Sequence, residues 1–320
     1  MERIFRTKMR KIKECKICGG KNFTFLYKNY DKALNIKKFF NLVKCLRCGV
    51  IFINPQPSFK ELSLHYSKKY YSLEKIKARE DSLKVKFRIF LYNLYFNPNN
   101  KNYFLKIIFY PFVNYLRGLK IAKKGRLLDI GSGSGQFLYE MRGFKMDLYG
   151  VEPGMFDKKS SERNGLNIKK GDLISARFPP NFFDVITMNH VLEHVPNPTE
   201  TIKEIYRILK KRGILIVAVP NYDSFAHKLF KKNWYQLDVP RHLFNYSTKI
   251  LLSKLSQKKL KIKKIRYNSR PTQFTKSLRY SFNLENNSFI FGILDVFFAP
   301  FTYIANILKQ GDQVEIWCIK

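Results

Sequence analysis

Four of the five cysteines form two pairs with the spacing of metal ligands. Cys15 and Cys18 make the first pair, Cys45 and Cys48 make the second, and a glycine follows each pair directly. Two residues between thiolates let a tight turn direct both sulfurs at one ion, and glycine adopts the positive φ that such a turn needs. Four thiolates leave no open coordination position, so we expect a structural Zn²⁺. A redox dithiol is the alternative, but it normally needs only one such pair.

A glycine-rich turn near the middle of the chain could hold a nucleotide-like ligand. Residues 126–130 are an apolar segment that we expect to form a strand, and residues 131–135 read Gly-Ser-Gly-Ser-Gly before a predicted helix. Glycines there let the backbone bend sharply and approach a ligand. The dinucleotide-binding pattern Gly-x-Gly-x-x-Gly needs a glycine at position 136, where this chain has Gln136, so the turn departs from that pattern. Asp129 precedes the turn, and Glu152 ends the next predicted strand, where an acid can accept both hydroxyls of an adenosine ribose.

Histidines supply candidates for proton transfer. His190, Glu193 and His194 are spaced so that a helix after the fourth strand would place all three on one face. That face could hold a divalent metal or form a pocket wall with hydrogen-bonded neighbours, and we favour the pocket wall. His242 follows the fifth predicted strand, and loops at that edge of a parallel sheet form the binding face. We expect His242 to act as a base or to hold the acceptor; a role in capping the helix that begins near Ser247 is the alternative.

The elements around these residues suggest three regions. A zinc-ribbon-like module over residues 12–58 contains alternating segments typical of short strands. Residues 59–118 are an aromatic-rich helical connector that could act as a lid, face a membrane or pack in the core. Strand and helix patterns alternate over residues 119–320, which indicates an α/β domain with a doubly wound parallel sheet. Cys318 lies in an apolar segment there and is expected to be buried.

These motifs resemble the class I S-adenosylmethionine (SAM)-dependent methyltransferases, and specifically a bacterial and archaeal group with an N-terminal zinc-binding module. The resemblance covers nearly all of the chain. It implies a seven-stranded Rossmann-like sheet with a small zinc ribbon and a helical insert, with SAM as cofactor and Zn²⁺ as a structural ion. The matching stretches are residues 127–135, 150–153, 183–186, 191–198 and 213–221.

The resemblance also implies roles for individual residues. In that family the region of Asp129 and Gly131 surrounds the methionine part of SAM, the position of Glu152 holds the ribose, and that of Asp172 contacts the adenine. Related enzymes that methylate quinone precursors have a glutamate where His190 stands, so metal binding at His190 is not favoured. The implied cofactor-binding residues are Asp129, Gly131, Ser132, Gly133, Gly135, Glu152, Pro153, Asp172, Leu173 and Asn189, and the candidate catalytic residues are His242, His194 and His190.

Charge and hydrophobicity bear on partners and location. The net charge of +36 would favour an anionic partner such as a membrane surface or nucleic acid, although lysines spread along the whole chain are also typical of solvated faces. The segment 1–13 lacks the apolar run of a secretory signal, so we expect a cytoplasmic protein. Residues 288–308 are long enough to span a bilayer, but the strands predicted at 260–267 and 313–319 pair in one sheet. We therefore expect helices that pack on the domain or lie at the inner membrane face.

The predicted function is methyl transfer from SAM to a small-molecule or lipid-linked acceptor, with a sugar of a surface polysaccharide suggested by analogy alone. The first alternative is an RNA methyltransferase. Residues 188–191 read Met-Asn-His-Val and lack the Asn/Asp-Pro-Pro-aromatic motif of amino-methylating nucleic-acid enzymes. The second alternative is a non-catalytic SAM-binding protein at the membrane.

Overall fold

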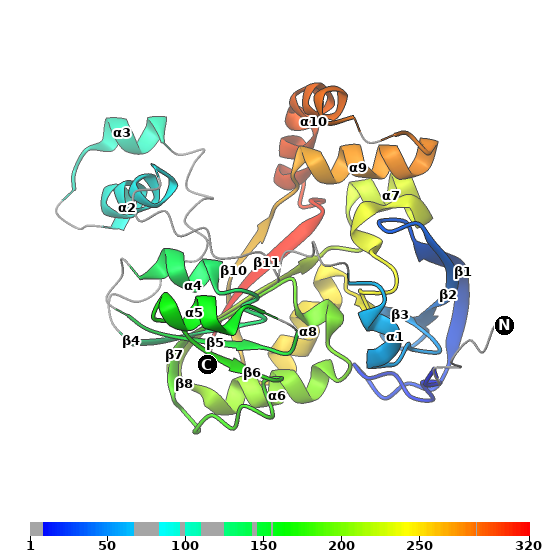
Figure 1. Ribbon diagram of the computed structural model, residues 1–320, viewed down its shortest axis with the longest axis horizontal. Helices are drawn as coiled ribbons and strands as arrows, with labels where there is room; N and C mark the ends of the chain where they lie inside the picture. The colour runs from blue at the N-terminus through cyan, green and yellow to red at the C-terminus, as the bar shows by residue number, and fades with distance from the viewer. Residues whose placement is uncertain are drawn as a thin grey trace. The chain divides into compact units, whose positions relative to one another are not determined.

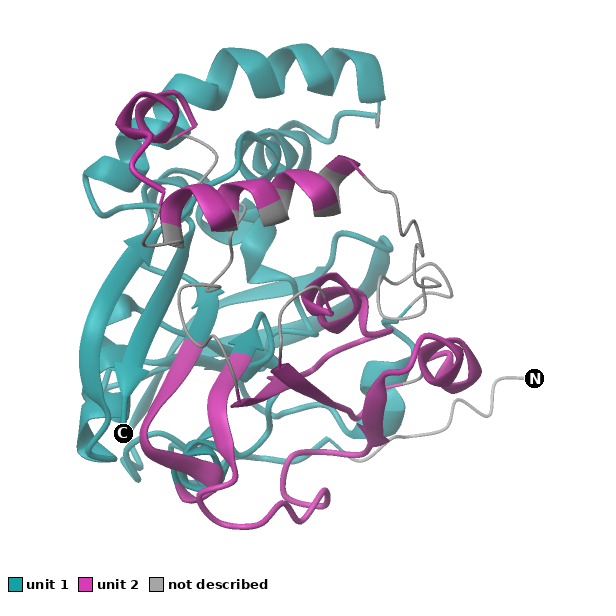
Figure 2. Cartoon of the chain, turned by 90° about the vertical axis from the view of Figure 1, so that its left-hand side faces the viewer, with its two compact units in different colours: residues 1–68, 188–206, 217–320 teal, residues 69–187, 207–216 magenta. Residues whose placement is uncertain are grey.

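The computed structural model describes residues 9–66, 83–96, 100–109, 125–142, 146–154, 156–285 and 287–320. Much of the predicted connector lies outside the described residues, so its role as a lid, a membrane-facing element or part of the core stays a prediction. The chain divides into two compact units (Figure 2). Unit 1 comprises residues 1–68, 188–206 and 217–320, and unit 2 comprises residues 69–187 and 207–216.

A seven-stranded sheet has the order β10-β11-β8-β7-β4-β5-β6 (Figure 1). Strands β4, β5 and β6 run parallel, whereas β10 and β11 pair antiparallel. The strand order reverses between β4 and β7, and ligands of open α/β sheets bind at the carboxyl ends of the strands at such a point. This confirms the predicted Rossmann-like sheet. The strands are β4 (Gly125–Ile130), β5 (Met146–Glu152), β6 (Asn167–Lys170), β7 (Phe183–Asn189), β8 (Leu209–Pro220), β10 (Lys261–Tyr267) and β11 (Gln313–Ile319).

The core of unit 2 packs helices against these parallel strands. Buried strand residues such as Leu127, Ile168 and Val185 contact Leu138 of α4 and Leu91 of α2. This cluster holds the start of α4, and with it the end of the glycine turn, against the sheet. The helices of this unit are α2 (Leu83–Phe96), α3 (Tyr103–Ile108), α4 (Gln136–Met141) and α5 (Lys158–Arg163).

A second sheet, in unit 1, has the order β1-β2-β3-β9. Its first three strands come from the N-terminal module: β1 (Phe23–Asp31), β2 (Ile36–Cys45) and β3 (Ile51–Ile53). β1 and β2 confirm the two strands predicted in this module, whereas β3 was not predicted. The fourth, β9 (Phe244–Asn245), comes from the segment that carries His242, and it pairs antiparallel with β3. The sequence did not predict this pairing, which ties the cysteine module to the histidine-bearing loop.

The remaining elements of the chain are mostly short helices of unit 1 and the longer helix α10. The helix start predicted near Ser247 is confirmed, but Ser247 and not His242 caps α8, by accepting a hydrogen bond from the amide of Ile250. The stretch predicted at 288–308 is the single helix α10, which packs on α9 (Figure 1). The remaining elements are α1 (Phe59–Ser63), η3 (Leu192–His194), α6 (Pro198–Ile208), α7 (Phe225–Phe230), η4 (Lys231–Asn233), η5 (Tyr235–Leu237), α8 (Thr248–Gln257), α9 (Pro271–Phe282) and α10 (Ser288–Ile307).

Candidate functional site

The glycine turn after β4 has the backbone that the sequence predicts. Gly131, Gly133 and Gly135 all have positive φ, at 70°, 55° and 88°. A Cβ atom at Gly135 would lie 2.7 Å from side-chain carbons of both Leu166 and Ile168. Glycine is therefore required at Gly135 for its backbone angle and for the close packing of the helix start on β6.

Glu152 lies beside this turn at the carboxyl end of β5. Its buried carboxylate accepts hydrogen bonds from the amides of Gly133, at 2.8 Å, and Gly154, at 2.7 Å. Each carboxylate oxygen has a second lone pair, so Glu152 can also accept from the two hydroxyls of a ribose. The Oγ atom of Ser132 is buried without a hydrogen-bond partner among the described residues. These groups fit a polar ligand held against the turn.

The other residues predicted to hold the cofactor have different environments. Asp129 is buried and accepts a hydrogen bond of 2.6 Å from Thr187 on the neighbouring strand β7. Asp172 is exposed and accepts from the amide of Ser175, whereas Leu173 is buried. Their contacts with an adenine stay a prediction, as does the role of exposed Pro153 and of half-buried Asn189 at the end of β7. Thr187 was not predicted, although a hydroxyl within an apolar strand is a signal that could have found it.

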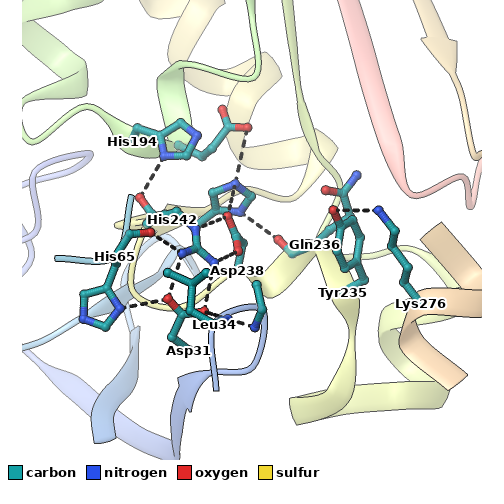
Figure 3. A network of polar contacts seen from close by, with 12 residues as sticks. Asp31, Leu34, His65, His194, Tyr235, Gln236, Asp238, His242 and Lys276 are labelled. Carbon is teal, nitrogen blue, oxygen red and sulfur yellow. Dashed lines mark hydrogen bonds and ion pairs between the residues drawn. The ribbon is translucent and has the colours of Figure 1, made fainter. Parts of the chain in front are cut away.

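Two histidines of unit 1 lie together beside a buried carboxylate (Figure 3). Nδ1 of His194 donates to the carbonyl of Arg241 at 2.9 Å, and Nδ1 of His242 donates to that of Gln236 at 2.7 Å. Since a carbonyl only accepts, both rings carry their proton on Nδ1 when neutral. Nε2 of His242 faces Glu193 Oε1 at 3.9 Å, and the two rings are 4.7 Å apart. The Nε2 lone pairs are thus available to accept a proton.

The predicted helical face of His190, Glu193 and His194 is wrong in one respect. His190 lies outside any helix with φ of 53°, and only η3, a single 3-10 turn, follows it. Nδ1 of His190 still pairs with Oε1 of Glu193 at 3.2 Å. The third member of the cluster around Glu193 and His194 is His242, where the sequence predicted His190. The segment after β8 returns His242 to η3.

Burial and neighbouring charge set the protonation of this cluster. Burial, and then the charge of His194, lower the pKa of His242 to about 4. Burial alone would raise the pKa of Glu193, but hydrogen bonding to His190 and the charges of the three histidines outweigh it and lower the pKa. At neutral pH His242 is therefore an uncharged imidazole beside a carboxylate, which is the form that a general base requires.

Comparison with known proteins agrees with this architecture. Residues 104–257 match the family described as "Methyltransferase domain". This similarity to methyltransferase domains extends over slightly less than half of the chain. An uncharacterized protein of Methanocaldococcus jannaschii is 34% identical over 111 residues, which cover 34% of this chain and 51% of the relative. A ubiquinone biosynthesis O-methyltransferase of Glaesserella parasuis is 30% identical over 115 residues, which cover 32% and 49%. The chain thus spans about half the length of these curated relatives.

A solved SAM-dependent methyltransferase from Archaeoglobus fulgidus resembles the chain with a TM-score of 0.44 and 18% identity. The match covers 72% of this chain and 99% of the other.

Within unit 1, a buried arginine holds the segment that carries His242. The Arg241 guanidinium donates to Asp31 of β1 at 2.7 and 3.1 Å and to Asp238 at 2.9 and 2.5 Å (Figure 3). It also donates to the carbonyl of His65, whose ring contacts Asp31 at 2.8 Å. Burial alone would raise the pKa of Asp238, but Arg241 outweighs it and lowers the pKa to about 2. Asp31, His65 and Asp238 were not predicted to be site residues.

The cysteines of the two predicted pairs meet in one cluster within unit 1. Sγ atoms of Cys15 and Cys48 are 3.7 Å apart, and those of Cys18 and Cys45 are 3.6 Å apart. Bonds of about 2.3 Å in a tetrahedral zinc site place sulfurs about 3.8 Å apart, so the cluster fits Zn²⁺. Cys318 is buried on β11 away from this group, as predicted, and burial raises the pKa of its thiol to about 12.

Proposed function

We propose that this protein transfers a methyl group from SAM to an oxygen, nitrogen or carbon atom of a small-molecule acceptor, which is quinone-type or lipid-linked. The arrangement of Glu152 against the glycine turn is the single observation that carries the SAM assignment. Three relatives bear names that state quinone chemistry: ubiquinone biosynthesis, hydroquinone and demethylmenaquinone methyltransferases. A sugar acceptor, as in surface polysaccharides, stays the analogy drawn from the sequence.

In this proposal the residues of the turn and its neighbours hold the cofactor. Glu152 would accept hydrogen bonds from the ribose hydroxyls, Ser132 would donate its unpaired hydroxyl, and Asp129 would lie near the methionine part. SAM supplies a methyl group that is already electrophilic because it is bonded to a sulfonium. The protein therefore has to place the acceptor in line and to accept its proton.

His242 is proposed as the base, with His194 beside it and Glu193 stabilising the imidazolium that forms. Its Nδ1–H bond to Gln236 fixes the tautomer in which Nε2 accepts. The cluster begins three residues after β7 ends, and residues that follow strand carboxyl ends form the ligand-binding edge of such sheets. His190 is proposed to orient Glu193, not to touch the acceptor.

The four clustered cysteines are proposed to hold a structural Zn²⁺. Such an ion has no open position for substrate, so its contribution is to fold the N-terminal module. Strand β3 of that module pairs with β9, the strand that follows His242.

Incubation with methyl-labelled SAM tests the proposal. The candidate acceptors are a soluble catechol, a prenylated quinol, a lipid-linked sugar and RNA. We expect label in a small-molecule or lipid acceptor, and we expect His242→Asn to lower kcat by about 10²–10⁴-fold while SAM affinity is kept. Label transferred only to RNA, or an unchanged kcat in His242→Asn, would contradict the proposal.

A further inference from the structure

Helix α10 exposes an apolar face that the described residues of unit 1 leave uncovered. Phe289 and Val296 are both 76% exposed, and Phe297 is 62% exposed. These residues recur along the whole helix, and the exposed positions contain no charged side chain. The exposed apolar residues of α10 are Phe289, Ile290, Ile293, Val296, Phe297, Phe301, Tyr303, Ile304 and Ile307.

The opposite face of α10 packs on α9 and contains the helix's one charge. Oδ1 of Asp295 accepts a hydrogen bond of 2.6 Å from Thr275 of α9. The rings of Phe298 and Phe274 lie 4.7 Å apart, and Thr302 is buried on the same side. At 100° per residue, the packed and exposed positions divide the helix into two halves. The helix is therefore oriented, with its polar groups toward the protein and its apolar half outward.

By length and composition, α10 is the one helix among the described residues that could cross a membrane. The strands around it exclude a single crossing. β10 ends at Tyr267 before α9, β11 begins at Gln313 after α10, and the two strands pair antiparallel in one sheet. A crossing by α10 would need a second span to return the chain, and α9 carries Lys276 and Arg279. A membrane that contacts the outward face of α10 therefore lies on one side of the helix and is not crossed by it.

Helix α9, which packs on α10, and helix α7, which contacts α9, contain basic but no acidic residues. α7 also exposes two apolar residues, Phe225 and Leu229. Among the described residues 224–233 and 271–310, the acids are Glu285 and Asp295, and Asp295 is engaged with Thr275. The basic residues of these segments are Lys228, Lys231, Lys232, Lys276, Arg279 and Lys309.

We propose that α10 lies in the interface of an anionic bilayer, with its apolar half among the acyl chains and the net charge of +36 attracting the chain to the headgroups. An apolar helical half with basic flanks is the form that interfacial helices take. A second copy of this chain fits less well, because two chains of +36 repel each other, whereas anionic lipid attracts them. The inference does not depend on the proposed methyl transfer.

Vesicle sedimentation tests this surface with the full chain and no SAM. The vesicles are phosphatidylcholine alone or phosphatidylcholine mixed with phosphatidylglycerol. We expect binding to the anionic vesicles at 0.15 M salt, reduced at least tenfold by Val296→Ser combined with Phe297→Ser. The charge variant Lys231→Glu with Lys232→Glu should also weaken binding, and more strongly at low salt.

Phe25→Ser with Leu46→Ser is the matched control, because these residues are exposed to a similar degree, at 56% and 63%, on the cysteine module. It should bind as the unsubstituted protein does. Equal binding by the Val296/Phe297 variant and the unsubstituted protein would overturn the proposal. So would absence of vesicle binding together with a dimer, seen by analytical ultracentrifugation, that the same variant dissociates.

Discussion

The guanidinium of Arg241 donates two hydrogen bonds to the carboxylate of Asp31, at 2.7 and 3.1 Å, and joins residues 210 positions apart in the chain. The carbonyl of the same arginine accepts the Nδ1 proton of His194. One residue therefore connects the N-terminal sheet to the orientation of an imidazole. Because both charged partners are buried, each depends on the other for its stability in the folded chain.

Removing the carboxylate in Asp31→Ala should destabilise the protein by about 3–5 kcal/mol, because Arg241 would stay buried with two of its five hydrogen bonds lost. Urea unfolding measures this change. Asp31→Asn keeps the shape and should cost less. Asp223→Ala removes an exposed carboxylate and is the control, expected to change stability by under about 0.5 kcal/mol. Equal losses in Asp31→Ala and Asp223→Ala would show that the Arg241 contact contributes nothing.

The low pKa of His242 predicts a loss of stability on mild acidification. The folded state holds this imidazole neutral down to about pH 4, whereas the unfolded chain takes up its proton near pH 6.5. The unfolded state thus binds more protons between these values, and the free energy of unfolding falls as pH falls. At pH 5 the contribution is about 2 kcal/mol.

His242→Gln should remove that part of the pH dependence between pH 7 and pH 5. Burial raises the pKa of Asp312 to about 6, which acts in the opposite sense, but it is common to both proteins and cancels in the comparison. Denaturant midpoints at several pH values measure the difference. The same slope in both proteins would refute the assignment of a neutral buried His242.

Alanine substitutions at two glycines with positive φ distinguish the cost of backbone strain from the cost of side-chain crowding. Gly135→Ala would place a Cβ 2.7 Å from Leu166 and Ile168, whereas Gly165→Ala, at φ of 66°, would meet nothing within 4 Å. We expect Gly165→Ala to cost about 1 kcal/mol and Gly135→Ala a further 1–3 kcal/mol, with weaker SAM binding only in Gly135→Ala. Thermal unfolding with and without SAM measures both effects. Similar costs for the two variants would mean that the close packing at Gly135 is unimportant.

The cysteine cluster predicts one tightly bound zinc ion per chain. Cys45→Ser should release it and lower the melting temperature, because the ion contributes directly to folding of the module. Cys318→Ser alters a buried thiol outside the cluster and should keep the zinc. Metal analysis by mass spectrometry gives the stoichiometry. Full zinc content in Cys45→Ser would rule out the four-thiolate site.

The cofactor turn could be predicted because its signals are local. The glycines at 131, 133 and 135 indicate the backbone conformation of the turn, and Glu152 at the end of the next strand indicates the acid beside it. All four lie within a short segment of the chain. The helix at α10 was predicted, but its outward face was not, because an apolar stretch does not reveal which side packs on α9. The domain boundaries at 12–58, 59–118 and 119–320 stay predictions.

The histidine cluster could not be predicted in full because it depends on contacts distant in sequence. His190 takes a left-handed conformation, so the expected helical face breaks before η3. Strand β9 is two residues long and has no periodicity that a sequence pattern could show. The Asp31–Arg241 pair joins two segments that no local motif relates, and Arg241 directly precedes His242 in the chain.

Isothermal titration with SAM tests the central claim most directly. Glu152→Gln keeps the shape of the side chain but removes the charge and one acceptor beside the glycine turn. Glu162→Gln, on an exposed position of α5, is the control. We expect one SAM per unsubstituted chain, at least tenfold weaker binding in Glu152→Gln and unchanged binding in Glu162→Gln. Failure of the unsubstituted protein to bind SAM, or full affinity in Glu152→Gln, would contradict the assignment of this turn as the cofactor site.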